Sequence, residues 1–83
     1  MKSEIKNIAE RIAFYRKQKG WTQNRLAEAV GFSRNTIVRY ENGESTPSYG
    51  KLIELAAALE LDPLLLIADK ELADYLREAG VKS

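Results

Sequence analysis

The chain contains no cysteine and no histidine among its 83 residues. Without cysteine it has no disulfide bond, no thiolate metal site and no cysteine nucleophile. Without histidine it lacks the commonest general base and the commonest transition-metal ligand. An enzyme of this composition would depend on a pair of carboxylates in a pocket, and short helices leave little room for one. We therefore expect a protein that is not an enzyme and that holds no metal and no cofactor.

Long hydrophobic runs are also missing. A five-residue apolar run such as 64–68 is far too short to span a bilayer. Charged residues interrupt the apolar positions between Ile5 and Tyr15, so nothing in this region resembles a signal peptide. We expect a soluble, cytoplasmic protein without membrane contact. The length is that of one domain with a small core.

The net charge of +1 conceals an uneven distribution of charge along the chain. Residues 1–40 contain nine Lys and Arg against three Glu, a balance of +6, whereas residues 41–83 contain four basic and nine acidic residues, a balance of −5. A basic half suits a surface that faces phosphates. A solvated dipole with no partner is the alternative, and the distribution of charge by itself does not separate the two.

The stretch 22–43 has the pattern of two short helices joined by a tight turn. Thr22 caps the first helix, and Gly31 ends it because glycine tolerates the left-handed backbone at a helix terminus. Ser33 caps the second helix by accepting from a free N–H group of its first turn, and Gly43 ends it. Two helices separated by three residues must cross steeply and share a small core.

The outer face of the second of these helices carries side chains rich in hydrogen-bond donors. Arginine can donate two hydrogen bonds to guanine O6 and N7, and asparagine can bridge adenine N6 and N7. An ordinary exposed helix surface would mix in Glu and Lys, and this face has neither. We predict that the face enters the major groove of double-stranded DNA, with base contacts from Arg34, Asn35, Thr36 and Arg39.

Four further helices are predicted from apolar periodicity and caps. The first runs from Glu4 to Gln18, the fourth follows Ser48, and the fifth starts at Pro63, where the missing N–H group costs nothing. A sixth covers 69–79 and ends before a glycine. The N-caps expected for the six helices are Ser3, Thr22, Ser33, Ser48, Asp62 and Asp69.

The predicted fifth helix contains four consecutive apolar residues, Leu64 to Ile67. At about 100° per residue they span roughly 300° of the helix circumference, more than one small core can cover. At least one of them must face either a second copy of the chain or the C-terminal segment. We predict a homodimer whose apolar seam is formed by Leu64, Leu65, Leu66 and Ile67.

Residues at characteristic spacings carry a family resemblance over about 5–67. They are Arg16, Gly20, Thr22, Gln23, Leu26, Ala27, Val30, Gly31, Ser33, Ile37 and 41–43. With these residues the chain resembles the helix-turn-helix of the phage repressor and Cro type, the XRE family. The resemblance implies an all-α, lambda-repressor-like DNA-binding domain of five helices, which we assign to 1–68, and we add a C-terminal helical extension over 69–83 in the same domain.

The resemblance also implies roles for three residues outside the base-contacting face. Gln23 would contact a phosphate and brace the second helix of the motif, and Arg16 and Glu41 would form a structural salt bridge. The chain departs from the family at Glu60, where a glycine often ends the fourth helix. From side-chain chemistry, further phosphate contacts are predicted around the base-contacting face, helped by the N–H groups that start the fourth helix; they come from Ser33, Asn42, Tyr49 and Lys51.

These features favour a sequence-specific DNA-binding transcriptional regulator, of the repressor type, that binds a palindromic operator as a homodimer. A close variant is the antitoxin or restriction-controller type, which also binds a partner protein. The opposing class is a helical protein-interaction module without DNA binding. The donor-rich face without acidic residues argues against that module.

Overall fold

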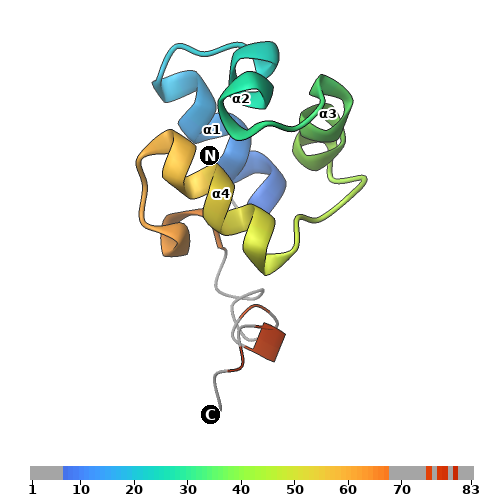
Figure 1. The fold of residues 1–83 in the computed structure, drawn as a ribbon, viewed down its shortest axis with the longest axis vertical. Helices are drawn as coiled ribbons and strands as arrows, with labels where there is room; N and C mark the ends of the chain where they lie inside the picture. Colours follow the sequence, from blue (N-terminus) through green and yellow to red (C-terminus); the bar gives the residue numbers. More distant parts are fainter. Residues whose placement is uncertain (1–6, 68–74, 76, 79, 81–83) are drawn as a thin grey trace, which may run out of the picture.

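The computed structural model describes residues 7–67, 75, 77, 78 and 80. The described residues contain helices and turns but no strand, and the predicted all-α class is confirmed. Four α-helices and one 3₁₀ turn follow one another (Figure 1): α1 (Ile8–Gln18), α2 (Gln23–Val30), α3 (Arg34–Asn42), α4 (Tyr49–Leu59) and η1 (Pro63–Leu66).

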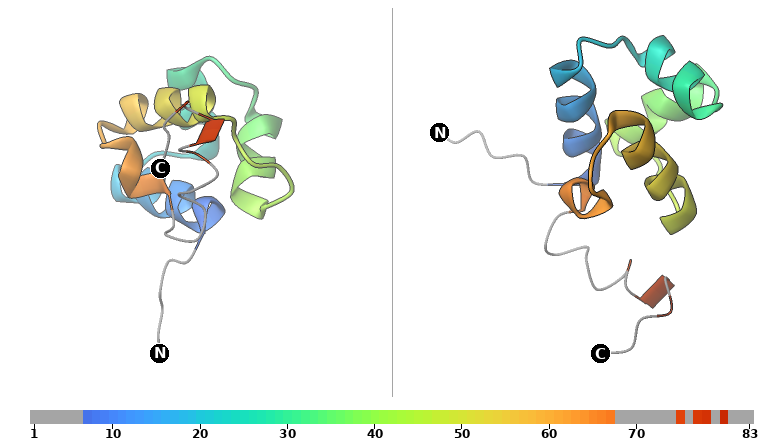
Figure 2. Two further views of the ribbon diagram at one scale, coloured as in Figure 1. Left: turned by 90° about the horizontal axis from the view of Figure 1, so that it is seen from below. Right: turned by 60° about the vertical axis from the view of Figure 1, so that its left-hand side comes forward.

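α1 contacts α3, α4 and η1, and α2 packs against α3 and α4. In Figure 1, α4 crosses in front of α1, while α2 and α3 lie above and to the right. Figure 2 shows η1, in orange, against α1. One hydrophobic core lies between these elements. Each helix buries its apolar face in this core, and this burial stabilises the packing of the helices against one another. Its fully buried large side chains are Ile12, Leu26, Ile37, Leu52, Leu55 and Leu66.

The caps predicted for α2 and α3 are present. Thr22 Oγ1 and Ser33 Oγ each accept a hydrogen bond from the N–H group three residues further on, over 3.0 and 3.1 Å. α2 ends at Gly31 (φ 77°) and α3 at Gly43 (φ 79°), both in the left-handed region. Residues 31–33 alone separate the two helices, so the helix-turn-helix predicted from the sequence is confirmed.

The first helix starts later than predicted. Asn7 has extended backbone (φ −136°, ψ 174°), and its side chain accepts from the N–H group of Glu10 over 2.9 Å. Asparagine is among the strongest N-cap residues, so it sets the start of α1 at Ile8. The predicted start at Glu4 is wrong, and the predicted cap Ser3 lies outside the described residues.

The predicted fifth α-helix is instead a 3₁₀ turn of four residues, so its helix type was predicted wrongly. Asp62 caps the turn as expected, with Oδ1 accepting from the Leu64 N–H group over 3.0 Å. The backbone is already extended at Ile67 (φ −103°, ψ 123°). In an α-helix the Leu65 carbonyl would accept from an N–H group four residues on, whereas here it accepts from Arg11 Nη1 of α1 over 3.3 Å. A tertiary contact thus takes the place of the helical hydrogen bond.

Most of the predicted sixth helix, 69–79, lies outside the described residues, and η1 is the last element assigned in the described part. Tyr75, Arg77 and Glu78 are described, and their backbone is helical. Tyr75 is buried, and its hydroxyl group donates to the carbonyl oxygen of Pro47 over 2.9 Å. This part of the C-terminal segment therefore packs against the residues that precede α4.

A buried ion pair joins α1 to α3, as the family resemblance implied. Arg16 Nε donates to Glu41 Oε2 over 2.7 Å, and Arg16 Nη2 donates to Glu41 Oε1 over 2.9 Å. Arg16 Nη1 donates to the Trp21 carbonyl oxygen over 2.7 Å. The two charged side chains are only 10% and 6% exposed. The hydrogen bonds to Glu41 raise the pKa of Arg16, against the lowering effect of burial, so the guanidinium stays charged.

Removing the negative charge of this pair should destabilise the fold. We predict that Glu41→Gln lowers the free energy of unfolding by about 3 kcal/mol, because Arg16 stays buried without a counter-charge. Arg16→Lys should lower it by about 1–2 kcal/mol, since the ammonium group keeps the charge but loses the planar fork. Urea unfolding followed by circular dichroism measures both changes.

Lys19→Ala is the matched control, because it breaks the more exposed ion pair between Lys19 and Glu60, which are 3.2 Å apart. Its expected effect is below about 1 kcal/mol. A loss for Glu41→Gln no larger than this control's would contradict the structural role of the buried pair.

The end of α4 offers a stabilising substitution. Glu60 has a positive φ of 61°, the only such value among the described residues other than glycine. Because left-handed backbone costs a residue with a Cβ roughly 1 kcal/mol, Glu60→Gly should raise the free energy of unfolding by about 0.5–1 kcal/mol. Glu60→Gln also loses the ion pair with Lys19 but keeps the Cβ, and it should give no gain. Equal urea midpoints for the two variants would show that this backbone is unstrained.

Candidate nucleic-acid interface

α3 turns one face to the core and the other to solvent at the edge of the fold (Figure 1). Ile37 is fully buried and Tyr40 is 6% exposed, so these two side chains fix the inner face. Arg34, Asn35 and Arg39 are exposed. Asn35 and Arg39 are four positions apart and therefore lie on the same side of the helix, and Arg34 is exposed at the first position of the same helix.

Thr36, the fourth predicted base contact, is half-buried. Its hydroxyl group shares a 2.8 Å hydrogen bond with that of Ser33, and Ser33 Oγ also accepts from the Thr36 N–H group. Thr36, a predicted base contact, and Ser33, a predicted phosphate contact, are thus hydrogen-bonded to each other at the start of α3. Each hydroxyl group has one hydrogen to donate and the pairing uses one of the two, so one hydroxyl hydrogen remains for a further acceptor.

Arg39 has an acidic neighbour that the sequence analysis missed. Arg39 Nε lies 3.9 Å from Glu44 Oε1, and the two side chains are 53% and 60% exposed. A pair this long and this solvated contributes little and leaves the terminal guanidinium nitrogens available. The left-handed backbone of Gly43 turns the chain back, so that the Glu44 N–H group donates to the Arg39 carbonyl oxygen over 2.9 Å. The glycine at the helix end was the only sequence signal for this contact.

Gln23, the first residue of α2, is tied to the buried ion pair. Its Nε2 donates to Glu41 Oε1 over 3.1 Å. The amide nitrogen carries a second hydrogen, which remains for an acceptor such as a phosphate oxygen. Gln23 and Glu41 are far apart in the sequence, and nothing in the spacing alone indicated this bond.

The start of α4 brings the other predicted phosphate contacts close to α3. Lys51 Nζ lies 4.9 Å from the centre of the Phe32 ring, which directly precedes the cap of α3. Asn42 is exposed at the end of α3. The backbone N–H group of Tyr49 donates to Glu78 Oε2 over 3.0 Å. A carboxylate of the chain itself therefore accepts from an N–H group that was expected to face a phosphate, and no sequence pattern indicated this bond.

The run predicted as a dimer seam is divided between the core and the surface. Leu66 and Ile67 are 0% and 6% exposed, so they pack in the core of their own chain. Leu64 and Leu65 are 58% and 44% exposed. The apolar surface available to a partner in this run therefore comes from Leu64 and Leu65.

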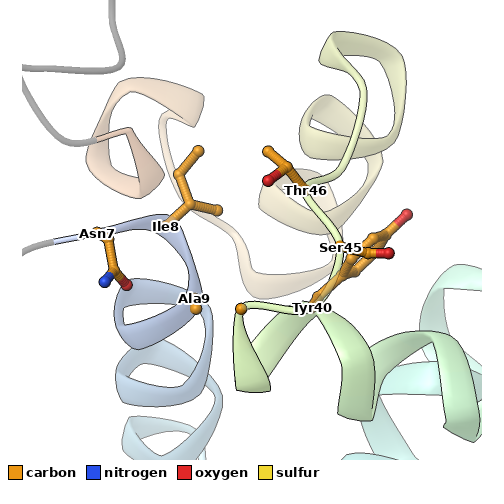
Figure 3. A pocket seen from close by; sticks show the side chains of 7 residues that line it. Asn7, Ile8, Ala9, Tyr40, Ser45 and Thr46 are labelled. Carbon is orange, nitrogen blue, oxygen red and sulfur yellow. The ribbon is translucent and has the colours of Figure 1, made fainter.

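A small pocket lies between the start of α1 and the end of α3 (Figure 3). Its volume of about 150 Å³ is below the roughly 300–1,000 Å³ of typical ligand sites. Burial raises the pKa of Tyr40, and the charge of Glu54 adds to the shift, so the phenol stays protonated. The pocket is lined by Asn7, Ile8, Ala9, Tyr40, Gly43, Ser45 and Thr46.

The described part of the chain lacks both a metal-binding cluster and a membrane-spanning helix. It contains no group of three or more His, Cys, Asp or Glu side chains arranged for a metal ion. None of its helices has the length and apolar character needed to cross a membrane.

Comparison with known proteins identifies the family of the chain. The profile of the helix-turn-helix family HTH_3 matches residues 12–66. The cryptic phage CTXphi transcriptional repressor RstR of Vibrio cholerae serotype O1 is 39% identical over 54 residues, which cover 65% of this chain and 48% of RstR. The chain thus spans about half the length of this curated relative.

Two solved structures have the same fold. The restriction-modification controller protein C.AhdI from Aeromonas hydrophila matches with a TM-score of 0.70 and 30% identity, covering 72% of this chain and 91% of that protein. SinR, the master regulator for biofilm formation, solved in complex with DNA, matches with a TM-score of 0.68 and 33% identity, covering 71% and 95%. With the profile matching more than half of its length, the chain belongs to the HTH_3 helix-turn-helix family, and the resemblance to XRE-type regulators is confirmed.

Proposed function

We propose that the protein is a sequence-specific DNA-binding transcriptional regulator that acts in the cytoplasm as a repressor, without an enzymatic step or a cofactor. The observation that carries the proposal is the outer face of α3, which exposes Arg34, Asn35 and Arg39 together. Ile37 and Tyr40 hold the inner face in the core, so the exposed face has a fixed orientation. The relatives RstR, a transcriptional repressor, and SinR, solved with DNA, support it.

In the proposed complex α3 lies in the major groove. Arg34 and Arg39 have the planar fork that matches guanine O6 and N7, and the Asn35 amide matches adenine N6 and N7. The Thr36 hydroxyl group is shared with Ser33, so the Thr36 methyl group is the more available part and suits the methyl group of thymine.

Phosphates on either side of the groove would fix the orientation of α3. The second amide hydrogen of Gln23 donates at the start of α2, and Ser33, Asn42 and Lys51 donate around α3. The Tyr49 N–H group belongs to the same set, because it lies at the N-terminus of α4, where the helix dipole favours an anion. These contacts add affinity without sequence preference.

A homodimer would place two such surfaces on a palindromic operator. Leu64 and Leu65 supply the apolar seam, and Leu66 and Ile67 support it from the core. A two-fold axis near η1 would set the two copies of α3 about 34 Å apart, one turn of DNA. We also assign 69–83 to the same domain as 1–68, because Tyr75 packs against Pro47.

The restriction-controller type is the second candidate, favoured by the similarity to C.AhdI. It would bind an operator through the same face of α3, so the experiments below apply to both candidates. A protein-interaction module without DNA binding would behave differently on heparin. Retention on heparin with elution that depends steeply on salt separates a DNA-binding protein from such a module.

Arg39 tests the assignment of base contacts. The operator is first obtained by selecting bound sequences from random duplexes. Arg39→Ala should then weaken binding to the selected duplex by about 1–3 kcal/mol and relax the preference at one base pair of each half-site. Binding is measured by fluorescence anisotropy on the selected and a scrambled duplex at two salt concentrations.

Lys51→Ala is the matched control, because it removes one exposed cation assigned to a phosphate. It should weaken both duplexes about equally and reduce the salt dependence by about one counterion. Equal weakening of both duplexes by Arg39→Ala would instead make Arg39 a phosphate contact.

Leu65 tests the dimer. Leu65→Asp places a charge on the proposed seam and should yield a monomer by sedimentation at micromolar concentration, where the wild type is a dimer, with weaker operator binding. Ile53→Asp adds the same charge to α4, at a position that is 36% exposed and outside the seam, and should remain dimeric. A Leu65→Asp chain that is as dimeric as the wild type would exclude this seam.

A further inference from the structure

The start of α4 already holds an anion supplied by the chain itself. Glu78 Oε2 accepts from the Tyr49 N–H group over 3.0 Å, across 29 positions of sequence. Tyr49 is the first residue of α4, and Ser48 caps the helix by accepting from the Lys51 N–H group over 3.3 Å. The carboxylate therefore takes a backbone donor at the positive end of an 11-residue helix.

A second contact fixes this arrangement independently of charge. The Tyr75 side chain is 5% exposed, and its hydroxyl group donates to the Pro47 carbonyl oxygen over 2.9 Å. Pro47 and Tyr49 flank the cap of α4, and Tyr75 and Glu78 lie three residues apart, about one helical turn. Two described residues of the C-terminal segment thus contact the start of α4, one through an aromatic hydroxyl group and the other through a carboxylate.

A carboxylate and a phosphate compete for such a donor, because both are anions that accept from backbone N–H groups at a helix N-terminus. With Glu78 in place the Tyr49 N–H group has its acceptor, and the negative charge repels a phosphate that approaches the same point. Lys51, the neighbouring cation, stays directed toward the ring of Phe32.

We infer that Glu78 occupies the place of a DNA phosphate at the start of α4, so that the contacts of Tyr75 and Glu78 with the start of α4 inhibit DNA binding by the same chain. This inference rests on the proposed function, since it assigns a regulator to the same phosphate site. DNA binding then requires Glu78 to leave the Tyr49 N–H group. If the segment is docked about nine-tenths of the time, the apparent affinity for DNA falls about tenfold.

The test compares Glu78→Gln with the wild type by anisotropy. Each protein first selects its own duplex from a random pool, and binding is then measured on the selected and a scrambled duplex. Glu78→Gln keeps the shape and an acceptor but removes the charge, and it should bind both duplexes more tightly than the wild type, by more than about twofold and up to about tenfold. Tyr75→Phe, which keeps the ring but loses the bond to Pro47, should also bind more tightly, by a smaller factor.

Glu54→Gln is the matched control for net charge, because it removes a carboxylate from the exposed surface of the same helix, away from its start. It should change affinity by less than about twofold, since an exposed charge away from the contact is screened. A direct readout is amide hydrogen exchange at Tyr49, which should be slow in the wild type and faster in Glu78→Ala, where the acceptor is gone.

The outcomes separate the two claims. A wild type that selects a duplex and loses its preference with Arg39→Ala, while Glu78→Gln binds within twofold of the wild type, overturns the inference and keeps the proposed function. An equal gain for Glu78→Gln and Glu54→Gln also overturns it, because the effect is then one of net charge. If neither the wild type nor Glu78→Gln selects any duplex, the proposed function falls and the inference falls with it.

Discussion

The placement of α3 depends on the buried ion pair between Arg16 and Glu41. One guanidinium makes two hydrogen bonds to α3 and a third to the Trp21 carbonyl oxygen, just before α2, and Gln23 adds a bond from α2 to the same carboxylate. A buried charge that loses its partner costs several kcal/mol, so α1, α2 and α3 can shift little relative to one another. Hydrogen bonds to base edges weaken steeply with distance and angle, and a helix that makes them needs such a fixed frame.

The basic and acidic halves of the chain contribute residues of opposite charge to the same surface. The basic half supplies the exposed arginines of α3, and the acidic half supplies Glu78, which lies on a backbone donor at the start of α4. Glu44 approaches Arg39 from the same acidic half, at 3.9 Å. Acidic side chains therefore reach the surface that the proposed function assigns to DNA, and they act there as competitors of phosphate, in addition to any effect on net charge.

The parts of the fold that the sequence predicted are those decided within one helical turn. The caps Thr22, Ser33, Ser48 and Asp62 all accept the hydrogen bonds expected of them, because a cap and its donor are two or three residues apart. The start of α1 was predicted wrongly because Asn7, inside the periodic pattern, is itself a strong cap. The fifth helix was predicted as α-helical because periodicity carries no information on side chains of other helices. Arg11 of α1, which takes the Leu65 carbonyl oxygen, is such a side chain.

The features of the candidate site that could be predicted from the sequence are likewise the local ones. The exposed donors of α3 follow from helical spacing, whereas the bond from Gln23 to Glu41 and that from Tyr49 to Glu78 join residues 18 and 29 positions apart. Helix chemistry indicated that an anion would lie at the start of α4, but it could not indicate which one. A carboxylate on the same chain has a high effective concentration there, and a phosphate must displace it. In the proposed mechanism the affinity for DNA therefore depends on how much more favourably the Tyr49 N–H group binds a DNA phosphate than it binds the Glu78 carboxylate. A change at Glu78 alters this free-energy difference without altering the face of α3 that contacts bases.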